Sequence, residues 1–128
     1  RVSVSGTAPA SPVDGDLWID NTTPAWTAPT LTNSWVNYGD IFTTAGYYKD
    51  ALGIIHLKGL VKSGTTSNAI FTLPTGYRPS QVAMFTVVAG PGVARIDIST
   101  NGAVYVAAYM ASGTNAYVSL DGITFATF

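Results

Sequence analysis

The chain contains no cysteine and no glutamate, and few of its residues are charged. Without cysteine, neither a disulfide framework nor a thiolate metal site can form. Six Lys and Arg residues against seven acidic ones give a net charge of −1. No basic stripe is therefore present to neutralise phosphates, which argues against nucleic-acid binding. The longest apolar runs, 82–89 and 103–111, are too short to span a bilayer, so we expect no membrane insertion.

What the chain does contain favours β-structure. It is rich in Thr, Val, Ile, Tyr and Phe, which suit a pleated and half-buried surface. Thirteen glycines and seven prolines separate short apolar runs, as turns separate strands. Because 47% of residues are hydrophobic and only 10% are charged, the polar coat is thin for a monomer. The composition predicts an all-β protein that covers part of its surface with other copies of itself.

Residues 1–34 differ in composition from residues 35–128. The first segment holds four of the seven prolines, which cannot donate to a sheet ladder, so it predicts an extended, Pro-rich neck or linker. Leu17, Trp18 and Ile19 interrupt it, and we expect them to dock on the head or on a neighbouring copy. Residues 35–128 form one head domain. The start at Arg1, without Met, suggests a piece of a longer protein.

The head alternates predicted strands and turns. Within 54–62, alternation places Ile55, Leu57 and Val61 toward the core and His56, Lys58 and Lys62 away from it. Segment 82–89 is almost continuously apolar, which predicts a strand buried on both faces. The full set of predicted strands is 35–38, 47–49, 54–62, 69–73, 82–89, the two arms of a hairpin over 93–109, 117–120 and 123–128.

The hairpin over 93–109 has the clearest local signal. Asn101-Gly102 lies between two alternating runs and suits a type I′ turn, in which both central residues need a positive φ. A two-residue turn there would pair Ile98 with Tyr105 and Ile96 with Ala107. The number of strands and their short connections predict an antiparallel β-sandwich, most simply a jelly roll.

Several short sequence motifs resemble those of the C-terminal head domains of tailed-phage tail fibres and receptor-binding proteins. The most specific is Leu-Pro-x-Gly-Tyr-Arg-Pro over 73–79, and the likeness covers residues 38–128. Further phrases are Tyr48-Lys49-Asp50, His56-Leu57-Lys58-Gly59, Ile70-Phe71-Thr72-Leu73-Pro74, Val118-Ser119-Leu120-Asp121-Gly122-Ile123 and, in the neck, Pro12-Val13-Asp14-Gly15-Asp16-Leu17-Trp18-Ile19-Asp20.

The resemblance implies a homotrimeric head at the fibre tip of a virion. Such a head adsorbs to a bacterial surface component, often a saccharide, and is carried by an upstream fibre or baseplate protein. It implies neither enzymatic activity nor a cofactor. Two alternatives remain open: a trimerising or capping module without ligand affinity, and a small hydrolase acting on cell-surface glycans.

The sequence contains no clear motif for a catalytic site or a metal site. A Ser-His-Asp triad would need His56, the only histidine, with Ser63 or Ser67, but no nucleophile elbow occurs. A pair of carboxylates for glycoside hydrolysis is not visible in sequence alone. Asp14, Asp16 and Asp20 suggest calcium, yet the chain lacks the closing bidentate Glu, and turn formation explains them. We therefore expect no catalytic residues and no metal.

Saccharide sites combine an aromatic face with side chains that hydrogen-bond to hydroxyls. The preferred candidate is the loop from Met110 to Ala116, which is long, polar and flanked by tyrosines. A polar contact from His56 is also considered, and so are the aromatic residues nearer the neck. The candidate residues are Tyr109, Asn115, Tyr117, Thr114 and His56, followed by Trp35, Tyr47 and Tyr48.

Overall fold

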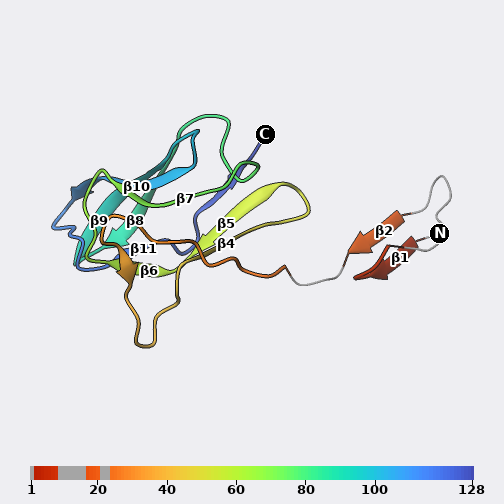
Figure 1. Ribbon diagram of the computed structural model, residues 1–128, viewed down its shortest axis with the longest axis horizontal. Coiled ribbons are helices and arrows are strands. Elements are labelled where there is room, and N and C mark those ends of the chain that lie inside the picture. The colour runs from red at the N-terminus through yellow and green to blue at the C-terminus, as the bar shows by residue number, and fades with distance from the viewer. Residues whose placement is uncertain (1, 9–16, 21–23) are drawn as a thin grey trace.

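A computed structural model describes residues 2–8, 17–20 and 24–128, and strands are the only regular elements in these ranges (Figure 1). The protein is all-β, as the composition predicts, and its head is an antiparallel β-sandwich. β1 (Val2–Ser5) and β2 (Leu17–Asp20) pair in parallel as a separate two-stranded sheet. Asp14 and Asp16 lie outside the described residues, as do the side chains of Leu17 to Asp20.

The larger sheet of the head has seven strands in the order β3-β6-β11-β8-β9-β10-β7, and every pairing in it is antiparallel. Its strands are β3 (Val36–Asn37), β6 (Leu60–Lys62), β7 (Ala69–Thr72), β8 (Ala83–Ala89), β9 (Gly92–Ile98), β10 (Ala103–Met110) and β11 (Val118–Ser119). The smaller sheet has the order β12-β5-β4, with β4 (Gly46–Lys49), β5 (Ile54–Lys58) and β12 (Thr124–Ala126).

The core lies between the two sheets. β5 contributes Ile55 and Leu57 and β6 contributes Val61, all at most 2% exposed, as the alternation in 54–62 predicts. This segment is not one strand, because it changes sheets at Gly59, whose φ is +119°. A side chain there would meet the backbone of Ala45 at 2.5 Å, so only glycine fits the crossing. Other fully buried side chains are Trp35, Ile70, Phe71, Leu73, Ile96, Ile98, Val104, Val106, Val118 and Leu120.

Residues 24–34 run along the head before β3. Thr27 exchanges two backbone hydrogen bonds with Tyr47, and the Thr32 N–H donates to Ile70 O at 2.8 Å. Leu31 packs against the core. This part of the predicted neck therefore shares hydrogen bonds and packing with the head, while the neck itself, its boundary at residue 34 and the jelly-roll strand order remain predictions.

The hairpin β9–β10 forms, but the predicted register and turn type are wrong. Ile98 pairs with Val104 and Ile96 with Val106, and a bulge follows between Val106 and Ala108. The loop has three residues, with Gly102 at φ +91° and the Gly102 N–H donating to Ser99 O. Asn101 does not adopt a positive φ, so the loop is a type I turn closed by a glycine bulge rather than type I′. The extra residue shifts the pairing by one, which brings Val104 and Val106 into the core.

The prediction that 82–89 is buried on both faces is also wrong. Phe85, Val87 and Ala89 point into the sandwich, but Met84 and Val88 on the opposite face are 63% and 58% exposed. β8 is a central strand with a solvent-facing side, which an antiparallel sheet permits. Its apolar outer side chains made the run look continuous in the sequence.

Candidate ligand-binding site

A loop between β3 and β4 projects from one side of the head (Figure 1). Its base is closed by Asn37, whose Oδ1 accepts a hydrogen bond from the Ala45 N–H at 2.8 Å. At its tip Gly39 and Asp40 have φ values of +84° and +55°, which turn the chain sharply. The tip exposes 87% of Ile41. We call residues 39–44 the projecting loop.

An open groove of about 580 Å³ lies between the projecting loop and the outer face of the larger sheet. The volume falls in the range of small-molecule sites. A smaller depression of about 250 Å³ continues from it along β8 and shares Val88, Ser119 and Asp121 with it. The groove is lined by Tyr38, Ile41, Phe42, Thr43, Leu60, Val88, Tyr117, Ser119 and Asp121.

Three aromatic rings meet in this groove. Tyr38 lies 5.2 Å from Phe42 and 6.4 Å from Tyr117 between ring centroids, with interplanar angles of 86° and 82°. Two rings thus stand nearly perpendicular to Tyr38, the edge-to-face arrangement that aromatic pairs favour. The Nζ atom of Lys62 lies 4.9 Å from the Tyr38 centroid, although Lys62 is not among the lining residues. We call Tyr38, Phe42 and Tyr117 the aromatic triad.

Polar groups lie beside the aromatic triad. Asp121 Oδ1 accepts a hydrogen bond from the Gly59 N–H at 2.8 Å, which fixes the carboxylate at the groove. The Asp121 N–H donates to Ser119 Oγ at 3.2 Å, so the Ser119 hydroxyl hydrogen is left to donate elsewhere. Within the described part of the chain, Asp121 Oδ2 takes part in no hydrogen bond. The groove therefore offers a carboxylate oxygen and a hydroxyl to a ligand.

Tyr117, one of the predicted site residues, lines the groove, whereas Tyr109 faces the other way. Tyr109 pairs with Ala94, whose side chain is fully buried, and it packs against the core. Its hydroxyl is buried without a hydrogen bond of good geometry to any described residue, and burial raises the pKa of this phenol. The two tyrosines lie on opposite faces of the larger sheet, so they do not form one site.

Thr114 and Asn115 are exposed, and their polar atoms bond within the chain. Asn115 Nδ2 donates to Gly64 O at 2.6 Å, and Asn115 O accepts from the Ser63 N–H. Thr114 Oγ1 accepts from the Ala116 N–H at 3.2 Å. These bonds hold the loop from Met110 to Ala116 against neighbouring turns. They account for the polar composition of that loop without a ligand.

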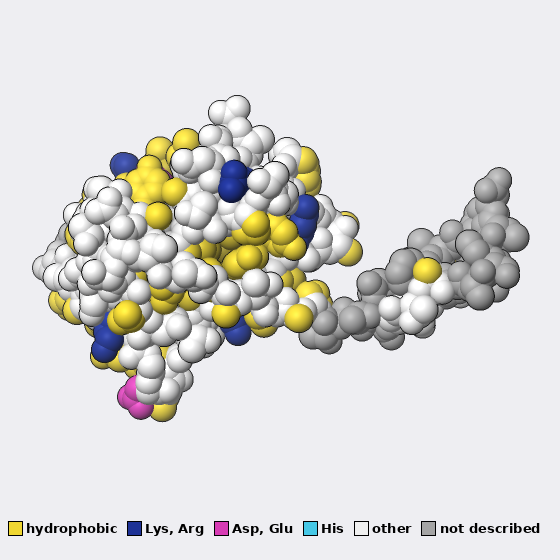
Figure 2. Space-filling view, in the orientation of Figure 1, with side chains coloured by type: hydrophobic (Ala, Val, Ile, Leu, Met, Phe, Trp, Pro, Cys, Tyr) yellow, Lys and Arg dark blue, Asp and Glu magenta, His cyan; other side chains and the backbone are white. Residues whose placement is uncertain are grey.

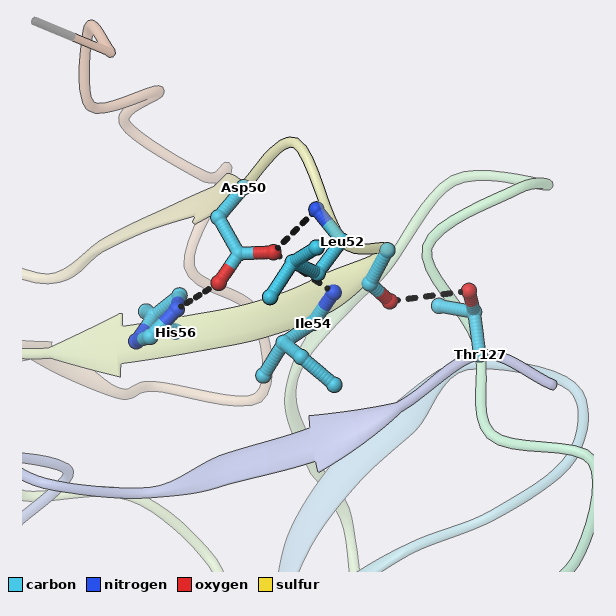
Figure 3. Close-up of polar contacts among 6 residues, drawn as sticks. Asp50, Leu52, Ile54, His56 and Thr127 are labelled. Carbon is cyan, nitrogen blue, oxygen red and sulfur yellow. Dashed lines mark hydrogen bonds and ion pairs between the residues drawn. The ribbon is translucent and has the colours of Figure 1, made fainter.

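His56 lies on the outer face of the smaller sheet (Figure 3). Its Nε2 atom donates to Asp50 Oδ2 at 2.8 Å, and its ring stacks on Tyr48 with centroids 4.6 Å apart and planes 9° apart. Trp26 meets Tyr48 edge to face at 4.5 Å, and the Nζ atom of Lys58 lies 4.7 Å from the Trp26 ring. These contacts join the three rings and Lys58 to one another, and Trp26 remains 41% exposed. The cluster attaches residues 24–28 to the head.

Trp35 and Tyr47 are 2% and 9% exposed and belong to the core. Burial, and secondarily the charge of Tyr77, raises the pKa of the Tyr47 phenol. Among the predicted aromatic candidates, Tyr117 is therefore the one that reaches the groove. The other groove residues were not predicted as a site, because segments 38–43 and 117–121 meet only through the strand order of the larger sheet.

A second feature of the outer face of the larger sheet is its apolar character. Val82, Met84, Val88 and Met110 are each at least 44% exposed on β8 and β10 or beside them. Between these strands the Arg95 Nε atom donates to Asp97 Oδ1 at 3.0 Å, so the central charges neutralise each other. On the face of the head that Figure 2 presents, scattered Lys and Arg side chains lie between several apolar patches.

No model of a known protein family matches the chain, and no curated protein sequence matches it. Within residues 2–8, 17–20 and 24–128, no three His or Asp side chains are grouped as a metal ion would require. The same residues include no helix of the length and apolarity needed to cross a membrane.

Proposed function

We propose that this chain is the receptor-binding head of a phage tail fibre or a related injection particle, and that it recognises a saccharide of a bacterial surface. The observation that carries the proposal is the groove, where the aromatic triad stands beside the Asp121 carboxylate and the Ser119 hydroxyl. Aromatic faces pack on the C–H surfaces of sugars, and these polar groups bind sugar hydroxyls.

The proposed function is binding without catalysis. Asp50, one of the described carboxylates, is engaged by His56 and by two backbone N–H groups. Asp97 is 5% exposed and bonded to Arg95. Neither carboxylate is presented to the groove, where Asp121 is the lining acid. An open groove with one carboxylate suits recognition better than the two-carboxylate chemistry of glycoside hydrolysis.

The head is proposed to act as a homotrimer. Outside the groove, the exposed apolar part of the outer face around Val82, Met84 and Met110 suits burial against another copy, because its Arg95–Asp97 ion pair leaves no net charge to repel an identical surface. This same face favours the second candidate function, a trimerising module without ligand affinity. The two candidates differ in one respect: only the receptor-binding head needs the groove.

The experiment is an array of bacterial surface glycans probed with the fluorescently labelled protein and two variants. Tyr117→Ala removes one wall of the groove, and Phe128→Ala removes an aromatic side chain that is 81% exposed elsewhere. We expect glycan binding by the parent protein, its loss in Tyr117→Ala and its retention in Phe128→Ala. A folded parent protein that binds no glycan would favour the trimerising module.

A further inference from the structure

We infer that the groove selects a positively charged ammonium group on its ligand, so that the recognised saccharide carries an amino or a choline-type substituent. The inference rests on the proposed function and narrows its ligand to a cationic class. The first observation is the aromatic triad, in which the ring planes of Phe42 and Tyr117 make angles of 86° and 82° with the ring plane of Tyr38. Differently oriented rings around one space are how proteins recognise ammonium ligands, because each ring face carries negative charge density.

The charge of the residues that line the groove also favours a cationic ligand. Asp121 is the ionisable acid among the lining residues, and no Lys or Arg is among them. Its Oδ1 is held by the Gly59 N–H, so the carboxylate keeps one position and can present Oδ2 to a cation. An anionic ligand would meet this carboxylate unfavourably. Charge complementarity therefore favours a cation at this place.

Lys62 places a cation against one ring of the aromatic triad, Tyr38. Its Nζ atom lies 4.9 Å from the Tyr38 centroid, within the range of a cation–π contact. Because Lys62 does not line the groove, the lining ring surfaces remain for a ligand. The ligand ammonium would contact Phe42 and Tyr117 in the same manner, with Asp121 as its counter-ion.

The decisive comparison uses two pairs of probes, each a cation and a neutral partner of closely similar shape. Choline chloride and its neutral analogue 3,3-dimethylbutan-1-ol are titrated into the protein by NMR, and D-glucosamine is compared with D-glucose in the same way. We expect each cation to bind about fivefold or more tightly than its neutral partner, a ratio that corresponds to the usual size of a cation–π contact with added Coulomb attraction. Equal affinities within both pairs would overturn the inference.

Two variants test the residues. Asp121→Asn retains an oxygen that can accept from the Gly59 N–H but removes the charge, so it should reduce the preference for the cation while leaving the melting temperature unchanged. Tyr117→Phe should retain that preference and Tyr117→Leu should lose it, because the ring face is the binding element. An undiminished preference in both Asp121→Asn and Tyr117→Leu would overturn the inference.

Failure of the inference and failure of the proposed function give different results. If the array yields neutral glycans whose binding Tyr117→Ala abolishes, and cations gain nothing over their isosteres, the charge selection is wrong and the receptor-binding function stands. If the array yields no glycan while choline binds more tightly than its analogue, the groove is a cation site and the saccharide function fails.

Discussion

Asp50 Oδ2 accepts a hydrogen bond from His56 Nε2 at 2.8 Å across the end of the β4–β5 hairpin (Figure 3). The other carboxylate oxygen accepts from the N–H groups of Leu52 and Ile54 at 2.9 and 3.0 Å. One carboxylate thus closes the hairpin turn and orients the imidazole on which Tyr48 stacks. The histidine that sequence reasoning considered for catalysis or for sugar binding is part of this connection.

The first prediction concerns pH. The hydrogen bond from His56, followed by the backbone N–H groups, lowers the pKa of Asp50 from its usual 3.8. A carboxyl group with a lowered folded-state pKa stabilises the fold fully above its unfolded pKa, and this contribution is lost as pH falls through the folded pKa. Asp50→Asn should therefore be less stable than the parent at pH 6, and the gap should narrow below about pH 3.8. Chemical denaturation at several pH values measures the gap; a constant difference would contradict the assignment.

The second prediction tests which face of β9 lies in the core. Ile98 is fully buried and pairs with Val104, so Ile98→Asp places an unpaired charge in the core and should cost about 3 kcal/mol or more. The matched control is Ile41→Asp, since Ile41 is 87% exposed at the tip of the projecting loop and should tolerate the change. Thermal unfolding compares them. A normal melting temperature for Ile98→Asp would mean that residue 98 does not face the core.

The third prediction concerns the closest packing in the head. A Cβ atom at Gly64 would lie 1.9 Å from Trp35 ring atoms, and Trp35 is 2% exposed. Gly64→Ala should therefore displace a core tryptophan and cost several times the roughly 1 kcal/mol expected for Gly76→Ala. Gly76 has open space around it but a φ of +92°, so its cost is backbone strain alone. Urea denaturation gives both values, and similar losses would contradict the packing at Trp35.

The fourth prediction addresses association. If the apolar outer face is buried between three copies, the protein should have a mass of about 40 kDa in solution, three times the 13.4 kDa of one chain. Met84→Asp should yield monomers, because it puts a charge on each copy at the centre of that face. Leu52→Asp is the control in the turn between β4 and β5, where Leu52 is 79% exposed. Light scattering after size exclusion distinguishes these results, and a monomeric parent would remove the trimer from the account.

Local pattern predicted much of the fold. Strand positions followed from short apolar runs between turn residues, and the core side of β5 and β6 followed from the alternation of Ile55, Leu57 and Val61. The hairpin register did not follow from the pattern, because Asn101-Gly102 is compatible with both a two-residue and a three-residue loop. The extra residue of the three-residue loop shifts every later pair by one. The exposed side of β8 was missed since Met84 and Val88 are apolar without being buried.

The site was harder to predict than the strands. Tyr117 was chosen for its place beside a polar loop, yet the groove that it lines depends on the neighbours that strand order supplies. Phe42 and Asp121 are 79 residues apart in the chain and meet only there. No local sequence pattern predicts a contact between segments this far apart. Local sequence also does not separate Tyr109 from Tyr117, because both flank the same polar loop, yet Tyr109 packs against the core.

The most direct test of the account is to locate the bound ligand by NMR on isotope-labelled protein, with the glycan that binds best on the array. The groove predicts that chemical-shift changes concentrate at the aromatic triad, Ser119 and Asp121. Changes centred on the loop from Met110 to Ala116, or on the stack of Tyr48 and His56, would place the ligand elsewhere and contradict the central claim.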